Sequence, residues 1–183
     1  SKLLLEKAHW VKSEYGAPGI TLSTPVVLER QTIKYPEEIK DSVQFVSFAY
    51  AGKDTPVDVF VTSSKYASKT KQNENKKEVP IDVLKFAELV LDRFEKEGAK
   101  NIISRNEQFI TPNGQEGIKT FGTADFVTNN VLSKGAYIVL GFSTPNLLQQ
   151  VVLTWKEDDV YADQIMERIL GSIELITLTE EQK

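Results

Sequence analysis

The residues of this chain that could do acid–base chemistry are isolated carboxylates. Asp125 stands between Ala124 and Phe126, and a carboxyl group in apolar surroundings is a candidate for a perturbed acid. A hydrolase would also need a second carboxylate in the same cleft. A simpler interpretation is a strand face partly open to water, because Thr123 and Phe121 would share that face with Asp125. We favour this second interpretation and expect no catalytic residue.

The chain has very few residues that could support histidine or cysteine chemistry. His9, beside Trp10, is the one histidine, and the chain has no cysteine. A serine triad or a zinc site needs a positioned base or several nitrogen and sulfur ligands. The sequence contains no G-x-S-x-G, P-loop or G-x-G-x-x-G motif. We therefore expect His9 at the surface or at a sheet edge, and we predict a protein that is not an enzyme.

One acidic cluster could hold a cation. Glu157, Asp158 and Asp159 directly precede a helical pattern. Helix capping and the favourable N-terminal dipole explain these acids better than a metal site does, and the spacing of a calcium-binding loop is absent. We expect no metal and no cofactor.

A lysine-rich stretch interrupts the pattern of strands. It carries two glutamates, very few apolar residues and five lysines: Lys65, Lys69, Lys71, Lys76 and Lys77. Such a segment could contact an acidic partner or lipid headgroups. Its mixed charge favours a solvated, flexible loop over 64–78.

The element around which these groups must be arranged is an amphipathic helix over 81–94. Its apolar face combines Val83, Phe86, Ala87, Val90, Leu91 and Phe94 at helical spacing. Charged residues occupy the opposite face, where Leu89 is the exception, and Gly98 follows as a left-handed stop. A face with two phenylalanines needs a broad apolar partner, so we expect this helix to cover a sheet.

Strands are predicted before and after this helix. The segments are 10–14, 20–23, 43–50, 57–61, 102–110, 117–127, 136–142 and 150–155. Asn113 and Gly114 indicate a tight hairpin, and Gly122 a bulge or a close backbone approach. A closing helix follows, with Ala162, Ile165, Met166, Ile169 and Leu170 on one face.

These elements predict one α+β domain over 1–183 with frayed ends. Short connections force antiparallel neighbours, because parallel strands need long crossovers. Strands 43–50 and 136–142 are apolar on both faces and require cover on both sides. The predicted architecture is an antiparallel β-sheet flanked by helices on both faces.

Composition limits the partners and the compartment. A net charge of −4 and a pI near 5.2 argue against nucleic-acid binding, and no apolar run approaches the length of a membrane span. The numbered chain begins at Ser1, and Met166 is its one methionine. We expect that an export signal was removed, which favours a periplasmic or cell-envelope location, with a membrane tether through a leader; a cytoplasmic location is the alternative.

Several segments together resemble the PsbP-like superfamily, which includes the PsbP, DcrB-like and Ran-binding Mog proteins. They are GITLSTP, EKEGAKNI, GIKTFGTADF, VVLTWKEDD and ADQIMERILGSIEL, spread from about Gly19 to Leu175. The resemblance implies an antiparallel sheet between helices and an adaptor or accessory role without catalysis. It carries no set of functional residues onto this chain.

The resulting functional hypothesis is a non-enzymatic binding or accessory protein, exported or of lipoprotein type, whose protein partner the sequence does not identify. An alternative is a carrier of a small apolar ligand between sheet and helix, beside Phe86, Val90 and Phe94. A third is a carboxylate-dependent hydrolase that uses Asp125. The sequence identifies no ligand-binding residue and no oligomeric state.

Overall fold

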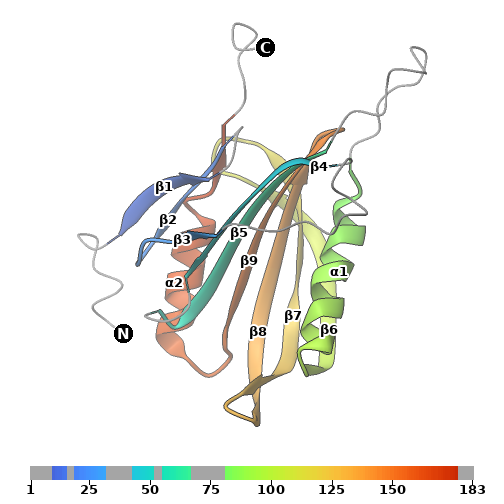
Figure 1. Cartoon of the computed structure of the whole chain (residues 1–183). Helices are drawn as coiled ribbons and strands as arrows, with labels where there is room; N and C mark the ends of the chain where they lie inside the picture. The colour runs from blue at the N-terminus through green and yellow to red at the C-terminus, as the bar shows by residue number, and fades with distance from the viewer. Residues whose placement is uncertain (1–9, 16–18, 32–42, 52–54, 67–80, 177–183) are drawn as a thin grey trace, which may run out of the picture.

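The computed structural model describes residues 10–15, 19–31, 43–51, 55–66 and 81–176. Two helices and two antiparallel sheets make up this part of the chain (Figure 1). The elements in chain order are β1 (Val11–Tyr15), β2 (Ile20–Thr24), β3 (Glu29–Gln31), β4 (Val43–Ala51), β5 (Val57–Tyr66), α1 (Val83–Lys96), β6 (Lys100–Ile110), β7 (Glu116–Thr128), β8 (Val131–Ser143), β9 (Leu147–Lys156), α2 (Val160–Leu170) and β10 (Glu174–Leu175).

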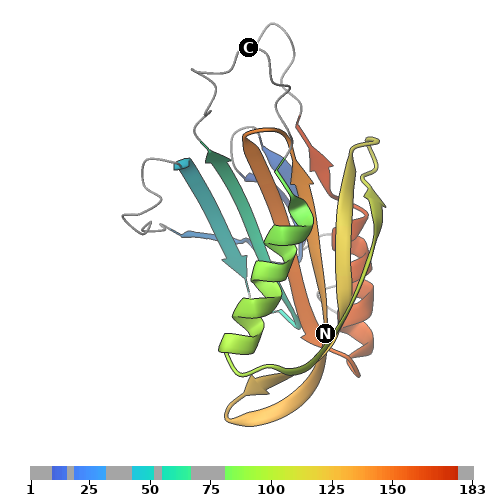
Figure 2. The same ribbon diagram turned by 90° about the vertical axis from the view of Figure 1, so that its right-hand side faces the viewer.

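The large sheet has seven strands in the order β3-β4-β5-β9-β8-β7-β6, and the small sheet has the order β1-β2-β10. Helix α1 lies on one face of the large sheet, and α2 with the small sheet lies on the other (Figures 1 and 2). The predicted α+β architecture, an antiparallel sheet with helices on both faces, is confirmed.

Helix α1 has the orientation that its sequence predicts. Asp82 caps it, since its carboxylate accepts from the backbone N–H groups of Leu84 and Lys85 at 3.1 and 3.3 Å. Phe94 is buried at 6% exposure, whereas Leu89 is 52% exposed. Gly98 follows with φ of 103°, the predicted left-handed stop.

Side chains fill the space between α1 and the large sheet. Ala87, Val90 and Phe94 pack on Tyr137 and Val139 of β8 and on Val152 of β9. These residues form what we call the α1 cluster. The α1 cluster therefore holds the helix against the large sheet.

Helix α2 is built in the same way on the opposite face. The carboxylate of Asp159 accepts from Tyr161 N and Ala162 N at 3.0 and 3.1 Å, so the predicted capping is confirmed for this acid. Ile165 and Ile169 are fully buried against the sheet, where Leu153 is their neighbour in the same core.

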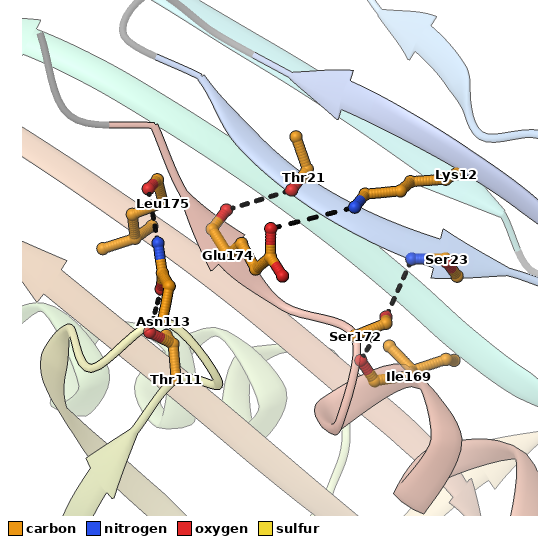
Figure 3. Close-up of polar contacts among 9 residues, drawn as sticks. All are labelled: Lys12, Thr21, Ser23, Thr111, Asn113, Ile169, Ser172, Glu174 and Leu175. Atoms are coloured by element: carbon orange, nitrogen blue, oxygen red, sulfur yellow. Dashed lines mark hydrogen bonds and ion pairs between the residues drawn. The ribbon is translucent and has the colours of Figure 1, made fainter.

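The short β10 joins distant parts of the chain (Figure 3). Ser172 Oγ accepts from Ser23 N at 2.8 Å and donates to Ile169 O at 2.7 Å. Thr21 Oγ1 donates to Glu174 O at 3.3 Å, and Asn113 Nδ2 donates to Leu175 O at 3.1 Å. The end of α2, the small sheet and the β6–β7 loop are thereby tied together.

Some predicted boundaries are wrong. β8 begins at Val131 rather than 136, because Asn129 and Asn130 have φ of 52° and 64° and make a two-residue turn that the sequence analysis took for a polar link. β9 is not the last strand, since β10 follows α2. The hairpin at Asn113 exists, but residues 111–115 form its loop.

The predicted flexible segment also needs a correction at its start. Ser64, Lys65 and Tyr66 belong to β5, where all three pair with β4, and Ser64 and Lys65 also pair with β9. The remainder of 64–78, His9 and the ends expected to fray lie outside the described residues.

Candidate functional site

A cleft of about 810 Å³ opens on the α1 face of the large sheet, beside the C-terminal end of α1. Arg93 and Phe94 of the helix and its C-cap residue Glu97 form the wall of the cleft. Its floor comes from the sheet and contains Asp58, Phe60, Phe126, Gly135 and Thr154. The cleft therefore begins where the α1 cluster ends.

Aromatic rings shape the inner part of this cleft. The Phe94 ring meets Phe126 edge-on with centroids 5.3 Å apart, and it meets Tyr137 at 5.7 Å. The guanidinium of Arg93 lies 5.9 Å from the centroid of Phe60. These contacts hold the rings against their neighbours. Hydroxyl and charged side chains complete the lining of the cleft.

Asp58 is the acid on the cleft floor. It lies on the α1 face because Val57 and Val59 point into the core on the opposite face. Thr154 Oγ1 donates to its carboxylate at 3.4 Å. Burial raises the pKa of Asp58, and the bond from Thr154 opposes that change by a smaller amount.

The surroundings of Asp58 make it chemically distinctive. Among the described residues, no salt bridge compensates this carboxylate. A poorly solvated acid among aromatic rings can bind a cation or, when protonated, donate a hydrogen bond. The sequence analysis missed Asp58. The available signal was an acid beside Phe60 in a segment, 57–61, whose other face is all valine.

Asp125, the acid singled out from the sequence, does not line this cleft. Its carboxylate accepts from Asn101 Nδ2 at 2.8 Å, and Asn101 has φ of 54° at the irregular start of β6. Asp125 thus holds a bulge in place, which is a structural role.

The three residues proposed for an apolar ligand site separate in the structure. Phe94 lines the cleft, Val90 is buried in the α1 cluster, and the Phe86 ring lies 6.1 Å from the ring of Tyr66. A ligand could therefore contact Phe94 from the cleft, but not Val90.

The acidic cluster before α2 is divided between structural contacts. Glu157 pairs with Lys134 at 3.3 Å, and Asp159 caps the helix. Within the described ranges, no three His, Asp or Glu side chains are grouped so that they could hold a metal ion. In the same part of the chain, no helix is both long and apolar enough to cross a membrane.

A second hollow of about 490 Å³ lies on the opposite side of the molecule. Trp10, Lys12, Ser23 and Arg168 line it, and the Arg168 guanidinium stacks over the Trp10 ring at 4.0 Å. This contact covers part of the Trp10 ring, so the hollow offers less free aromatic surface than the α1 cleft.

The solution structure of cyanobacterial PsbP (CyanoP) from Synechocystis sp. PCC 6803 is similar to this chain, with a TM-score of 0.50 and 12% sequence identity. The similarity covers 94% of this chain and 95% of that one. No family model and no curated protein matches the sequence. The chain therefore has a PsbP-like fold, which confirms the resemblance inferred from its sequence, and at this identity the similarity concerns the fold alone.

Proposed function

We propose that this protein is a non-enzymatic binding domain that receives an organic cation with an apolar body in the cleft beside α1. The observation that carries the proposal is the half-buried carboxylate of Asp58 on a floor walled by Phe60, Phe94 and Phe126. Binding sites typically combine a mostly apolar concavity with a few convergent polar groups.

Charge and aromatic surface favour the same ligand class. An ammonium group would regain for Asp58 the solvation that burial removes, and aromatic faces attract cations. Arg93 and Lys156 also line the cleft and would repel a cationic group placed near them, and Arg93 already lies over the Phe60 ring. The cationic head should therefore enter towards Asp58 and Thr154, with the apolar body along Phe94 and Phe126.

The test is a calorimetric or NMR titration with phenethylamine as the probe and 2-phenylethanol as its neutral counterpart. We expect Asp58→Asn to weaken phenethylamine binding about tenfold or more, the scale of one charge-assisted hydrogen bond. Asp92→Asn is the matched control, because Asp92 is an exposed acid of α1 outside the cleft.

Two results would overturn the proposal. Phenethylamine binding that is indifferent to Asp58→Asn would remove the role of the carboxylate. Equal binding of 2-phenylethanol would instead support the second candidate, a carrier of small apolar ligands that uses the rings of Phe94 and Phe126.

The cellular setting belongs to the same proposal. An exported, cell-envelope protein, lipid-anchored through a leader and acting as an accessory to a protein partner, agrees with the sequence-based expectation and with the accessory roles that a PsbP-like fold implies. Sequencing the N-terminus of the complete gene product tests this part. A start without a signal or lipoprotein leader would contradict it while leaving the cleft proposal intact.

A further inference from the structure

Strand β6 forms one end of the large sheet and pairs with β7 along one side (Figures 1 and 2). All of its side chains are exposed except Ile102 and Phe109, which are partly buried. Ile103 and Ile110 are 61% and 56% exposed. A long edge strand with exposed apolar side chains is a template for pairing with another strand.

The sequence of β6 is complementary to itself when it is read in the opposite direction about Asn106. An antiparallel copy centred there would place Arg105 opposite Glu107 of the copy. Moving outward, the remaining pairs would be Ser104 with Gln108, Ile103 with Phe109, and Ile102 with Ile110. Each pair then joins two polar residues, two apolar residues or two opposite charges. The exposed Ile103 and Ile110 each gain an apolar neighbour.

Symmetry restricts the other registers. A two-fold axis perpendicular to the sheet relates two β6 strands as antiparallel neighbours and keeps the two faces of the sheet unchanged. Each residue therefore lies opposite a residue of the same face in the copy, and one residue lies opposite its own copy across the axis. An axis at Arg105 would place arginine opposite arginine, and an axis at Glu107 would place glutamate opposite glutamate. Like charges directly opposite destabilise a strand pair, so an axis at Asn106 is favoured over these two neighbouring axes.

The charges of β6 also explain how this edge could avoid indiscriminate pairing. Glu107 already pairs with Lys119 at 3.0 Å across the β6–β7 ladder. Arg105 of a second copy would extend this pair into a three-member network. Charged side chains on an edge usually oppose association. In the register about Asn106, however, Arg105 lies opposite Glu107 of the copy, so the charges attract.

We propose that β6 is a self-association surface, through which a second copy of this chain adds antiparallel, with the two Asn106 residues facing each other across the two-fold axis. The pairing joins two seven-stranded sheets into one and keeps both α1 helices on the same face. An interface of one strand pair is small, so the dimer is weak and concentration-dependent.

The absence of cysteine from the sequence allows a direct test. In the proposed register the two Asn106 Cα atoms lie about 4.5–5.5 Å apart, within disulfide range. Oxidation of Asn106→Cys should therefore give a covalent dimer. Ser104→Cys and Gln108→Cys are matched controls, because each residue would be offset from its own copy by about 13 Å along the strand. We expect at least about tenfold more crosslinked dimer from Asn106→Cys.

Charge exchange tests the same register without a crosslink. In sedimentation velocity, Arg105→Glu should abolish the dimer by placing acid opposite acid, and Arg105→Glu with Glu107→Arg should restore it. Thermal melting of each variant shows whether the monomer is intact. A protein that stays monomeric at millimolar concentration, or controls that crosslink as well as Asn106→Cys, would overturn the proposal.

Discussion

The phenol of Tyr137 donates a hydrogen bond to the backbone carbonyl of Ile103 at 2.7 Å. Tyr137 is on β8 and Ile103 on β6, so the side chain reaches across the intervening strand β7. It can do so because Gly122 of β7 has no side chain; a Cβ there would lie 1.8 Å from Ile103 O. The close backbone approach predicted for Gly122 is confirmed, and its reason is this bond.

Gly122→Ala tests that arrangement. The added methyl group would collide with backbone rather than with a movable side chain, so β6 or β7 must shift and the bond from Tyr137 is lost. We expect a loss of about 1–3 kcal/mol or more in urea unfolding. Gly171→Ala is the control, because its nearest contact would be an ordinary 3.5 Å. Equal effects of the two substitutions would contradict the steric explanation.

Alkaline unfolding should report on the same tyrosine. Burial raises the pKa of Tyr137, with an opposing effect from a hydrogen bond with Ser104. The neutral phenol of Tyr137 therefore stabilises the fold. Its full contribution to the free energy of unfolding is present below the ordinary tyrosine pKa of about 10, and it is lost as pH rises through the higher pKa of Tyr137 in the folded protein. Tyr137→Phe should show a shallower loss of melting temperature at alkaline pH than the wild type. Tyr66, whose pKa burial also raises, supplies the background common to both proteins.

Asp58 should lower stability in the same direction as pH rises, but already at neutral pH. Burial raises its pKa, so the fold prefers the protonated acid, and the penalty appears as pH rises through the folded pKa. Asp58→Asn should raise the melting temperature at pH 7, and this advantage should shrink as the wild-type acid is protonated on acidification. Thermal melts from pH 3 to pH 8 provide the measurement. A constant difference across that range would show that ionisation is not its source.

Core truncations should separate buried from exposed apolar residues. Phe94→Ala removes a ring in contact with Phe126 and Tyr137, and should cost about 3–5 kcal/mol. Ile169→Ala, at a fully buried position of α2, should cost about 2–5 kcal/mol. Leu89→Ala should change stability by no more than about half a kcal/mol. A large penalty at Leu89 would instead indicate that a partner or a second layer covers that side of α1.

Metal binding should be weak. In the ranges that the structure describes, the acidic side chains are not gathered into a ligand set. Calorimetry with zinc and with calcium should therefore show no stoichiometric binding tighter than about micromolar, the range of dedicated calcium sensors. A tight, saturable site for either ion would contradict this expectation.

The helices could be predicted from the sequence because local physics decides them. The apolar spacing from Val83 to Phe94 and the cap at Asp159 depend on residues a few positions apart. Strand pairing depends on contacts distant in sequence, so β10 was missed: the two residues Glu174 and Leu175 carry no pattern of their own and become a strand only beside β2.

The cleft could not be predicted for the same reason. Asp58, Phe94 and Phe126 come from three separate elements, and nothing in their local sequences places them together. For Asp125, the sequence analysis favoured a strand face partly open to water over a perturbed acid. Its apolar neighbours suggested a perturbed acid, but its position opposite the bulge of β6 gave it Asn101 as a partner.

The pairing of β10 with β2 has a consequence for synthesis. Glu174 pairs with Thr21, 153 residues earlier in the chain. At a translation rate of about 5–20 residues per second, β2 must wait about 8–30 s for its second partner. During that time the growing chain exposes one unpaired edge of the β1–β2 hairpin and the fully buried Ile20 and Leu22, which also pack in the core beneath α2. A nascent chain of this protein should therefore be a substrate for chaperones that hold exposed strands until α2 and β10 have left the ribosome.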